Sequence, residues 1–166
     1  MIENHLNNRF VTLYALPFLL GGLSILSFQP FNFSFINLFI FPLIFYLIIH
    51  INKKSKSIYR KKPYKKNLFI FGTAFGFGFY LIGLHWIIYS LTFDESFKIL
   101  IPFGLILIPL FLSLFFSLTT LLVGPFLRMN VGSILLFSGA ISFSDYIRDK
   151  VLTGFPWNLW AYTSSW

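Results

Sequence analysis

Long stretches without a charged side chain constrain the fold of this sequence more than any other feature. Such stretches recur from residue 10 to residue 144, separated by short polar connections. About 20 apolar residues in a helix span a hydrocarbon core about 30 Å thick. We therefore predict an all-α fold, a polytopic transmembrane helix bundle with about five membrane segments, at residues 10–28, 35–51, 68–91, 99–123 and 131–152.

The overall composition supports a membrane protein and excludes several other classes. The 166 residues are 57% hydrophobic and 11% charged, whereas soluble globular domains are about 45–50% apolar and about 25% charged. The same excess of apolar residues excludes a disordered chain. Because the chain has no cysteine, it forms no disulfide, no thiolate metal site and no cysteine nucleophile. We predict no metal site and no cofactor.

The first uncharged stretch, residues 10–28, has a cleaved signal peptide as its alternative interpretation. It is longer than the roughly 7–15 apolar residues usual in a signal peptide. Its end, Ser27 to Pro30, contains no small-x-small cleavage site, so we expect a retained helix. In the second segment, Pro42 is expected to kink the helix, which a membrane tolerates when neighbouring groups satisfy the freed carbonyl.

The net charge of +8 is concentrated in one connection, which predicts the orientation of the bundle. Eight of the 13 lysines and arginines follow the second segment: Lys53, Lys54, Lys56, Arg60, Lys61, Lys62, Lys65 and Lys66. Basic residues next to membrane segments are retained in the cytoplasm, so loop 52–67 and the N-terminus are expected to be cytoplasmic. Alternation then places Asp94 and Glu95 outside, Arg128 inside and residues 154–157 outside. The loop contains no aromatic or glycine-rich recognition pattern, so we expect no nucleic-acid binding.

Small residues in the third segment predict close helix packing. Gly72 and Gly76 form a GxxxG pair and Gly83 follows on about the same helical face, an arrangement that lets two membrane helices approach closely. Trp86 lies near the external end of this segment, where aromatic rings favour the headgroup region. His85 beside it has no second histidine or carboxylate nearby in the sequence, so we interpret it as a packed or interfacial side chain.

Charged residues reappear near the end of the fifth segment, at Asp145, Arg148 and Asp149. On a helix, Arg148 shares a face with Asp145, so its guanidinium can hold that carboxylate. Ionisable groups inside a membrane are costly unless they are paired, which makes them functional candidates. The alternative is a helix end that simply reaches the membrane interface, and the sequence favours neither interpretation.

The same region resembles a known family. Residues 144–158, with Asp145, Arg148 and the run Thr153-Gly154-Phe155-Pro156-Trp157, are similar to the E-x-x-R and t-G-F-P-W signature of bacterial apolipoprotein N-acyltransferases. Residues 26–31 resemble the early L-x-F-x-P-F pattern of the family, and residues 76–90 resemble its G…G-L-x-W-I-x-x-S helix. Asp145 stands where the family pattern has Glu, which keeps the charge and shortens its reach.

The resemblance implies an enzyme of the bacterial inner (cytoplasmic) membrane that completes lipoprotein maturation. Such enzymes take an acyl chain from a membrane phospholipid and transfer it to the α-amine of the diacylglyceryl-modified N-terminal cysteine of a lipoprotein. They use a cysteine thioester, a glutamate base and a lysine, all in a nitrilase-like periplasmic domain. The candidates for substrate access or for the structure of the membrane portion are Asp145, Arg148, Gly154, Phe155, Pro156 and Trp157.

Catalysis by this chain alone is not expected. It has no cysteine, offers no Ser/His/Asp arrangement as a replacement, and ends just after the signature, where the family continues into further helices and the catalytic domain. We therefore interpret residues 1–166 as a truncated N-terminal transmembrane domain. Two alternatives are a small non-enzymatic integral membrane protein, such as a transporter or an assembly factor, and a membrane domain fused to another enzyme. The sequence shows no inverted repeat that would support transport.

Overall fold

The computed structural model describes residues 8–55, 64–93, 95–151 and 158–163, and every regular element in these ranges is helical. The all-α prediction is therefore confirmed for the described part of the chain. In chain order the elements are η1 (Val11–Ala15), α2 (Leu16–Ser24), η2 (Ile25–Ser27), η3 (Ser34–Ile36), α3 (Asn37–Ser55), α4 (Tyr64–Gly83), α5 (Ile87–Leu91), η4 (Glu95–Leu100), α6 (Ile101–Val123), η5 (Gly124–Phe126), α7 (Val131–Val151) and η6 (Trp160–Thr163), where η marks 3₁₀- or π-helical turns.

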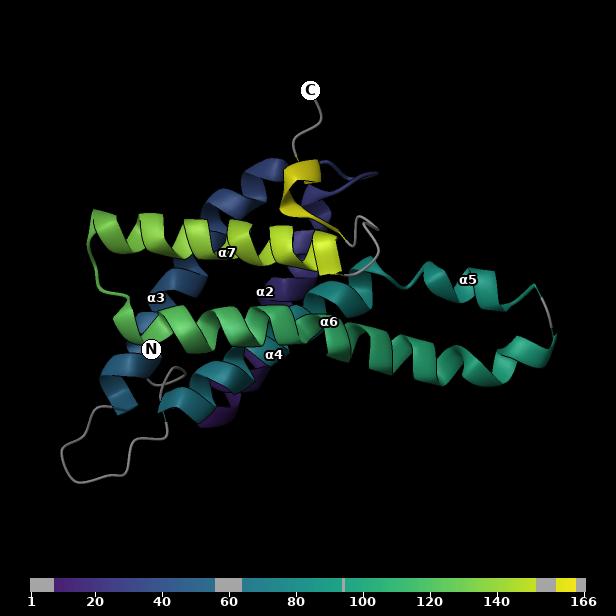
Figure 1. Ribbon diagram of the computed structural model, residues 1–166, viewed down its shortest axis with the longest axis horizontal. Helices are drawn as coiled ribbons and strands as arrows, with labels where there is room; N and C mark the ends of the chain where they lie inside the picture. The colour runs from purple at the N-terminus through teal and green to yellow at the C-terminus, as the bar shows by residue number, and fades with distance from the viewer. Residues whose placement is uncertain (1–7, 56–63, 94, 152–157, 164–166) are drawn as a thin grey trace.

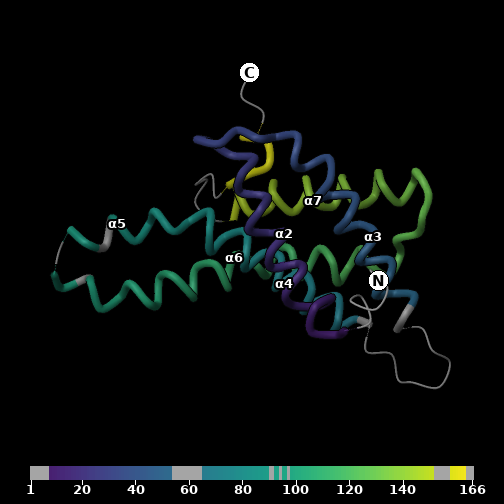
Figure 2. The backbone as a smooth tube through the Cα atoms, turned by 180° about the vertical axis from the view of Figure 1, so that it is seen from behind, coloured from purple at the N-terminus to yellow at the C-terminus, as the bar shows by residue number. Residues whose placement is uncertain are grey.

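Helix α4 is the centre of the arrangement (Figure 1). It packs along α6 on one side and along α2 on another, and α7 lies beside α6. Helix α3 packs on α4 and reaches η5, the turn that follows α6. Beyond this bundle, α5, η4 and the first turns of α6 form a hairpin that projects away from the other helices, as the opposite view also shows (Figure 2).

Glycines on two sides of α4 permit its close approach to both neighbours. The predicted pair Gly72 and Gly76 faces α6, where a Cβ at Gly76 would lie 2.8 Å from the Ser113 Cα. On the side of α2, a Cβ at Gly78 would overlap the Phe18 carbonyl. Each approach brings backbone against backbone, which only very small residues allow between helices. Two of the three glycines predicted for helix packing thus lie in the α4–α6 contact.

The third of these glycines, Gly83, ends α4 and lies against different partners. A Cβ there would overlap the side-chain amide of Asn158 and lie 2.7 Å from Ile25 Cδ1. The backbone then tightens into a turn, in which the Ile87 N–H donates to the Leu84 carbonyl over 3.0 Å. Such i→i+3 bonds end a regular α-helix. The stretch 68–91 is therefore divided into α4 and α5 by this turn.

Two helical stretches are long and apolar enough to cross a membrane, Ser34–Lys53 and Lys98–Phe126, and Val11–Ser27 is a shorter apolar helix. Helix α3 continues through Pro42 without a break. The glycines and lysines of α4 and the serines and charges of α7 reduce the apolar character of those two helices. A membrane crossing by each of about five segments stays a prediction.

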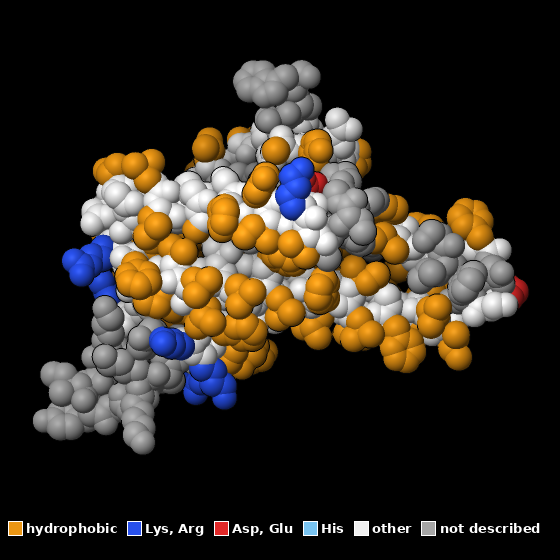
Figure 3. Space-filling view, viewed as in Figure 1, with side chains coloured by type: hydrophobic (Ala, Val, Ile, Leu, Met, Phe, Trp, Pro, Cys, Tyr) orange, Lys and Arg blue, Asp and Glu red, His pale blue; other side chains and the backbone are white. Residues whose placement is uncertain are grey.

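Several connections meet at one end of the molecule. Arg9 Nη2 donates to Asn67 Oδ1 over 3.3 Å, so the chain before η1 lies at the start of α4. Asn52 Nδ2 donates to the Gly124 carbonyl, so the end of α3 lies at the end of α6. Figure 3 shows basic side chains at this end and an acidic one at the tip of the hairpin. The predicted orientation puts these connections on one side of the membrane, and the structure places them at one end of the molecule. That this side is the cytoplasmic one stays a prediction.

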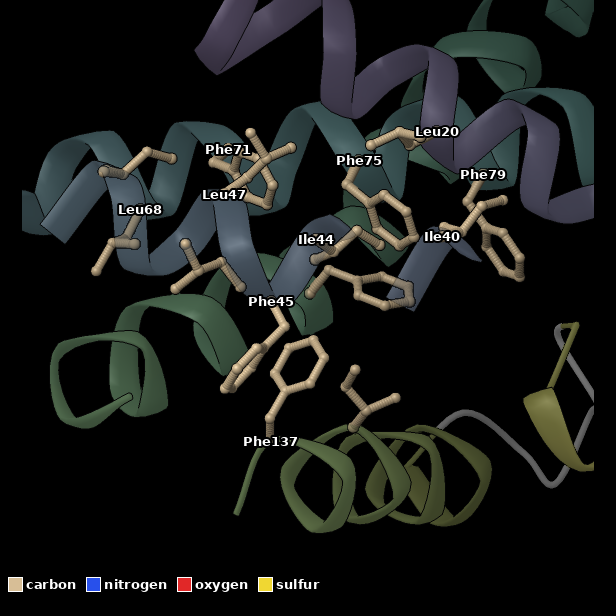
Figure 4. Close-up of a cluster of buried hydrophobic side chains, with 14 of the residues drawn as sticks. Leu20, Ile40, Ile44, Phe45, Leu47, Leu68, Phe71, Phe75, Phe79 and Phe137 are labelled. Atoms are coloured by element: carbon tan, nitrogen blue, oxygen red, sulfur yellow. The ribbon is translucent and has the colours of Figure 1, made fainter. Parts of the chain in front are cut away.

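Aromatic side chains of α4 fill the centre of the bundle (Figure 4). Phe71, Phe75 and Phe79 lie at successive turns of α4 and are buried. Below them in this view, Phe45 of α3 faces Phe137 of α7, with ring centroids 5.6 Å apart. Rings that pack in tilted pairs of this kind are favourable beyond their area alone. This core fixes α7 relative to α3 and α4, and with it the charged residues of the second half of α7.

Candidate functional site

The C-terminal half of α7 brings Asp145 and Arg148 together, as their spacing predicts. Arg148 Nη2 lies 3.0 Å from Asp145 Oδ1, and the two side chains are 1% and 13% exposed. Charges at this degree of burial are tolerated only when they are paired. Asp149 points elsewhere, 3.5 Å from Lys150 Nζ, and its side chain is 26% exposed. Of the two aspartates, Asp145 is therefore the one engaged inside the bundle.

Tyr80 of α4 completes the surroundings of the arginine. Arg148 Nη1 donates to the Tyr80 hydroxyl, and the Arg148 Cζ lies 5.2 Å from the centroid of the Tyr80 ring. Both residues are 0% exposed. A guanidinium over an aromatic ring gains a cation–π attraction that is larger when water is excluded. The cluster of Tyr80, Asp145 and Arg148, called the α7 cluster below, thus joins α7 to the last turn of α4.

The carboxylate of Asp145 also holds the chain that follows α7. The Trp160 backbone N–H donates to Asp145 Oδ2 over 3.0 Å, which satisfies an amide at the start of η6 that has no partner within the turn itself. The Trp160 ring stacks on Phe79 with centroids 4.7 Å apart and meets Phe41 edge-on at 4.8 Å. The α7 cluster and these rings fix η6 against the bundle.

Most of the predicted site residues belong to the stretch of chain between α7 and η6. The predicted residues Gly154, Phe155, Pro156 and Trp157 fall between these two elements and lie outside the described residues. The chain resumes at Asn158, whose φ is 47° and whose side-chain amide lies against Gly83. Residues 152–157, called the signature segment below, are thus bounded by Val151 at the end of α7 and by Asn158 before η6.

The remaining predicted residues lie away from the α7 cluster, in the turn after α4. Trp86 is 48% exposed, and His85 is exposed, with its Nδ1 2.6 Å from the Ile82 carbonyl oxygen. Among the described residues there is no group of three or more His, Cys, Asp or Glu that could hold a metal ion. In the α7 cluster the carboxylate is committed to an arginine and an amide, and the Tyr80 hydroxyl accepts from the same arginine. The chemistry of the cluster is that of a structural clamp.

Sequence reasoning missed Tyr80 and Trp160, the two partners of the cluster. A tyrosine within an otherwise apolar stretch is a usable signal, because a buried Tyr hydroxyl needs a hydrogen-bond partner. Trp160 gave no such signal, since its contact with Asp145 is made by the backbone and not by the side chain.

Comparison with known proteins identifies the relatives of this chain. A family model described as the apolipoprotein N-acyltransferase N-terminal domain matches residues 20–166. The apolipoprotein N-acyltransferase of Rhodopseudomonas palustris is 32% identical over 149 residues, which are 89% of this chain and 27% of the relative. That of Rickettsia typhi is 34% identical over 149 residues, again 89% of this chain and 27% of the relative.

A third relative agrees with these two. The apolipoprotein N-acyltransferase of Rhizobium etli is 30% identical over 145 residues, which are 86% of this chain and 26% of the relative. The chain thus spans only about a quarter of the length of the curated relatives it matches (27% of the first). The matched region contains the α7 cluster, the glycines of α4 and the signature segment. This chain belongs to the family of apolipoprotein N-acyltransferase N-terminal domains.

Proposed function

We propose that this chain is the membrane portion of an apolipoprotein N-acyltransferase, an enzyme that transfers a phospholipid acyl chain to the N-terminal diacylglyceryl-cysteine of lipoproteins. The observation that supports this most directly is the family match over residues 20–166, together with relatives that all have this name. Its partners are then the acyl-donor phospholipid and the lipoprotein substrate, and its place is the bacterial inner membrane, as a multi-pass protein.

The surface of the described helices supports a membrane location. Large apolar side chains lie exposed along the outer face of α6, among them Leu107, Phe111 and Leu118, and Figure 3 shows apolar side chains spread over this face of the molecule. Soluble monomers rarely expose continuous apolar surface of this extent, whereas lipid tails solvate it without cost. The gathering of basic residues at one end supports a cytoplasmic N-terminus and basic loop.

Within that enzyme, the α7 cluster has a positioning role in our proposal. Asp145 pairs with Arg148 within α7 and accepts from the Trp160 amide in η6, so one carboxylate joins the elements that precede and follow residues 152–157. In this proposal Gly154 to Trp157, the predicted substrate-access residues, act at the external membrane surface. Because the chain has no cysteine, it supplies no acyl-enzyme nucleophile and is inert alone.

Two measurements test this function. The first reads the genomic reading frame beyond the codon of Trp166, and we expect further helices and a nitrilase-like domain with Glu, Lys and Cys. The second incubates the purified 166-residue chain with phosphatidylethanolamine and a diacylglyceryl peptide and follows the peptide mass, for which we expect no N-acylation. A stop codon after Trp166 in an expressed gene would refute the acyltransferase assignment, and acylation by the short chain would refute its inertness.

A further inference from the structure

An apolar groove opens between η1 and α2, α4 and α6, away from the α7 cluster. Its volume is about 580 Å³, and its walls include Phe10 and Phe18 on the first helix, Phe69 and Phe77 on α4, and Leu110 on α6. This volume is in the range of about 300–1,000 Å³ usual for small-molecule sites. The groove runs lengthwise, because its wall residues recur at successive turns of two neighbouring helices.

The lining excludes most classes of ligand. Apart from the hydroxyls of Tyr14 and Thr73, the lining side chains are hydrocarbon. The Thr73 hydroxyl already donates to the Phe69 carbonyl over 2.9 Å and lies 2.7 Å from the Ser117 hydroxyl. A sugar, a nucleotide or an extended peptide would therefore bury polar groups without partners, which is costly. An alkyl chain has no polar group to satisfy, so it fits this lining.

One end of the groove is positively charged. Arg9 precedes Phe10, and its guanidinium lies over the first turn of α4 through its hydrogen bond to Asn67. Lys66 is exposed and precedes Ile70 by four residues, so by helical period it lies above the groove face of α4. The described carboxylates lie elsewhere, in η4 and in α7. Two basic side chains at the mouth of an apolar groove match an anionic headgroup that continues into an alkyl chain.

We propose that this groove binds one acyl chain of an anionic phospholipid, whose phosphate is held by Arg9 and Lys66. This inference rests on the proposed membrane location and not on the acyl-transfer reaction. The lipid is a resident partner at the basic end of the bundle. It is distinct from the acyl donor, which we place beside the signature segment that begins after α7. The Phe10 and Tyr14 rings, stacked with centroids 5.7 Å apart, form the wall along which the chain enters.

A photo-crosslinking experiment in native membranes tests the proposal. Benzoylphenylalanine replaces Phe77 in the groove of the full chain, and in a parallel variant it replaces Leu118, which is 49% exposed on α6 and does not line the groove. After illumination, the adduct masses report which lipids were in contact. We expect the ratio of anionic to zwitterionic phospholipid adducts to be about tenfold higher at position 77 than at position 118.

Substitutions at the mouth of the groove distinguish lipid binding at this site from a general attraction of anionic lipid to positive charge. The double variant Arg9→Gln/Lys66→Gln is expected to remove most of the anionic enrichment at position 77, about tenfold. Arg128→Gln removes an exposed charge at the same end of the molecule without touching the groove, so it leaves the enrichment unchanged. Equal ratios at positions 77 and 118, an equal loss with Arg128→Gln, or a protein adduct at position 77 each overturns the proposal.

The Leu118 adducts keep this test separate from the test of function. Lipid adducts at position 118 without anionic enrichment at position 77 reject the groove and leave the membrane location standing. The absence of lipid adducts at both positions rejects the membrane location on which the inference rests. Neither result depends on whether the chain takes part in acyl transfer.

Discussion

The backbone N–H of Trp160 donates to the carboxylate of Asp145 over 3.0 Å, across a sequence separation of 15 residues. The same carboxylate holds Arg148, one turn later in α7. Asp145 thus joins the second half of α7 to η6 through a single carboxylate. Its loss is expected to release the end of the described chain while α7 itself stays folded.

The first prediction concerns this carboxylate. Asp145→Ala leaves the buried Arg148 guanidinium without its ion-pair partner, so we expect unfolding to become easier by about 3 kcal/mol, together with faster hydrogen exchange at the Trp160 amide. Asp149→Ala is the matched control, since its partner Lys150 is largely exposed, and we expect a change below about 1 kcal/mol. Denaturation in mixed micelles measures the unfolding free energy of each variant, and mass spectrometry measures the amide exchange. Equal effects of the two variants would contradict the buried Asp145–Arg148 ion pair.

In a full-length enzyme, other substitutions at the same two positions test the positioning role. We expect Asp145→Asn to lower N-acylation of a diacylglyceryl peptide at least tenfold at normal expression, because the amide keeps one acceptor and loses the charge held by Arg148. Asp145→Glu, which restores the carboxylate, is expected to recover activity. Asp149→Asn should act like the unchanged enzyme. Normal activity of Asp145→Asn would leave the cluster with a structural role only.

The hydroxyl of Tyr80 provides a second, independent test of the α7 cluster. Tyr80→Phe removes the oxygen that accepts from Arg148 Nη1 and keeps the ring, so a buried donor is left unsatisfied at a cost of about 1–3 kcal/mol. Tyr89→Phe is the control, because Tyr89 is 67% exposed and its substitution is expected to be neutral. Thermal unfolding of the two variants in the same detergent gives the comparison, and identical midpoints would argue against the hydrogen bond.

Helix packing can be tested with two glycines that both lie inside helices. Gly76→Ala places a Cβ 2.8 Å from the Ser113 Cα, so α4 and α6 must separate, and we expect a loss of about 1–3 kcal/mol. Gly139→Ala meets nothing within 4 Å, so the better helix propensity of alanine is expected to stabilise by up to about 1 kcal/mol. Unfolding free energies of opposite sign are the expected result. A destabilising Gly139→Ala would indicate a partner that covers this face of α7.

The predicted orientation is open to a direct chemical test, because the chain has no cysteine of its own. A cysteine at Lys53, at the exposed end of α3, is expected to react with an impermeant maleimide only from the cytoplasmic side. One at Phe93, which is 89% exposed, is expected to react only from the external side. Labelling of intact and inverted vesicles measures this, and labelling of both positions from the same side would refute the orientation.

Features encoded by neighbouring residues could be predicted from the sequence. The uncharged stretches indicated helices, and the separation of Asp145 and Arg148 indicated a shared helical face, because both depend only on the local period. The partners of each helix could not be predicted in this way. Tyr80 and Arg148 are 68 positions apart, and nothing in either local pattern indicates the other.

The glycines of α4 also show that a local sequence pattern does not identify the partners of a helix. The spacing of Gly72, Gly76 and Gly83 predicts one shared face, yet Gly83 lies against Asn158 and Ile25, while Gly78, outside the pattern, lies against Phe18. An amphipathic helix indicates its buried face by the contrast between polar and apolar sides. Helix α4 has no charged side chain after its first turn, so the sequence gives little contrast from which the partner of each side could be chosen.

The close fit of α4 between α2 and α6 also bears on how the protein is made. Its glycines remove the side chains that would otherwise favour lipid, so α4 gains less from the bilayer by itself than α3 or α6 does. During synthesis α2 emerges before α4, and α6 emerges after it. In the proposed membrane setting, α2 and α3 both precede α4 out of the translocon, α4 packs more extensively on α2 than on α3, and α6 secures it only later. Biogenesis of this bundle is therefore expected to be most sensitive at the α2–α4 contact, where the Phe18 carbonyl meets Gly78.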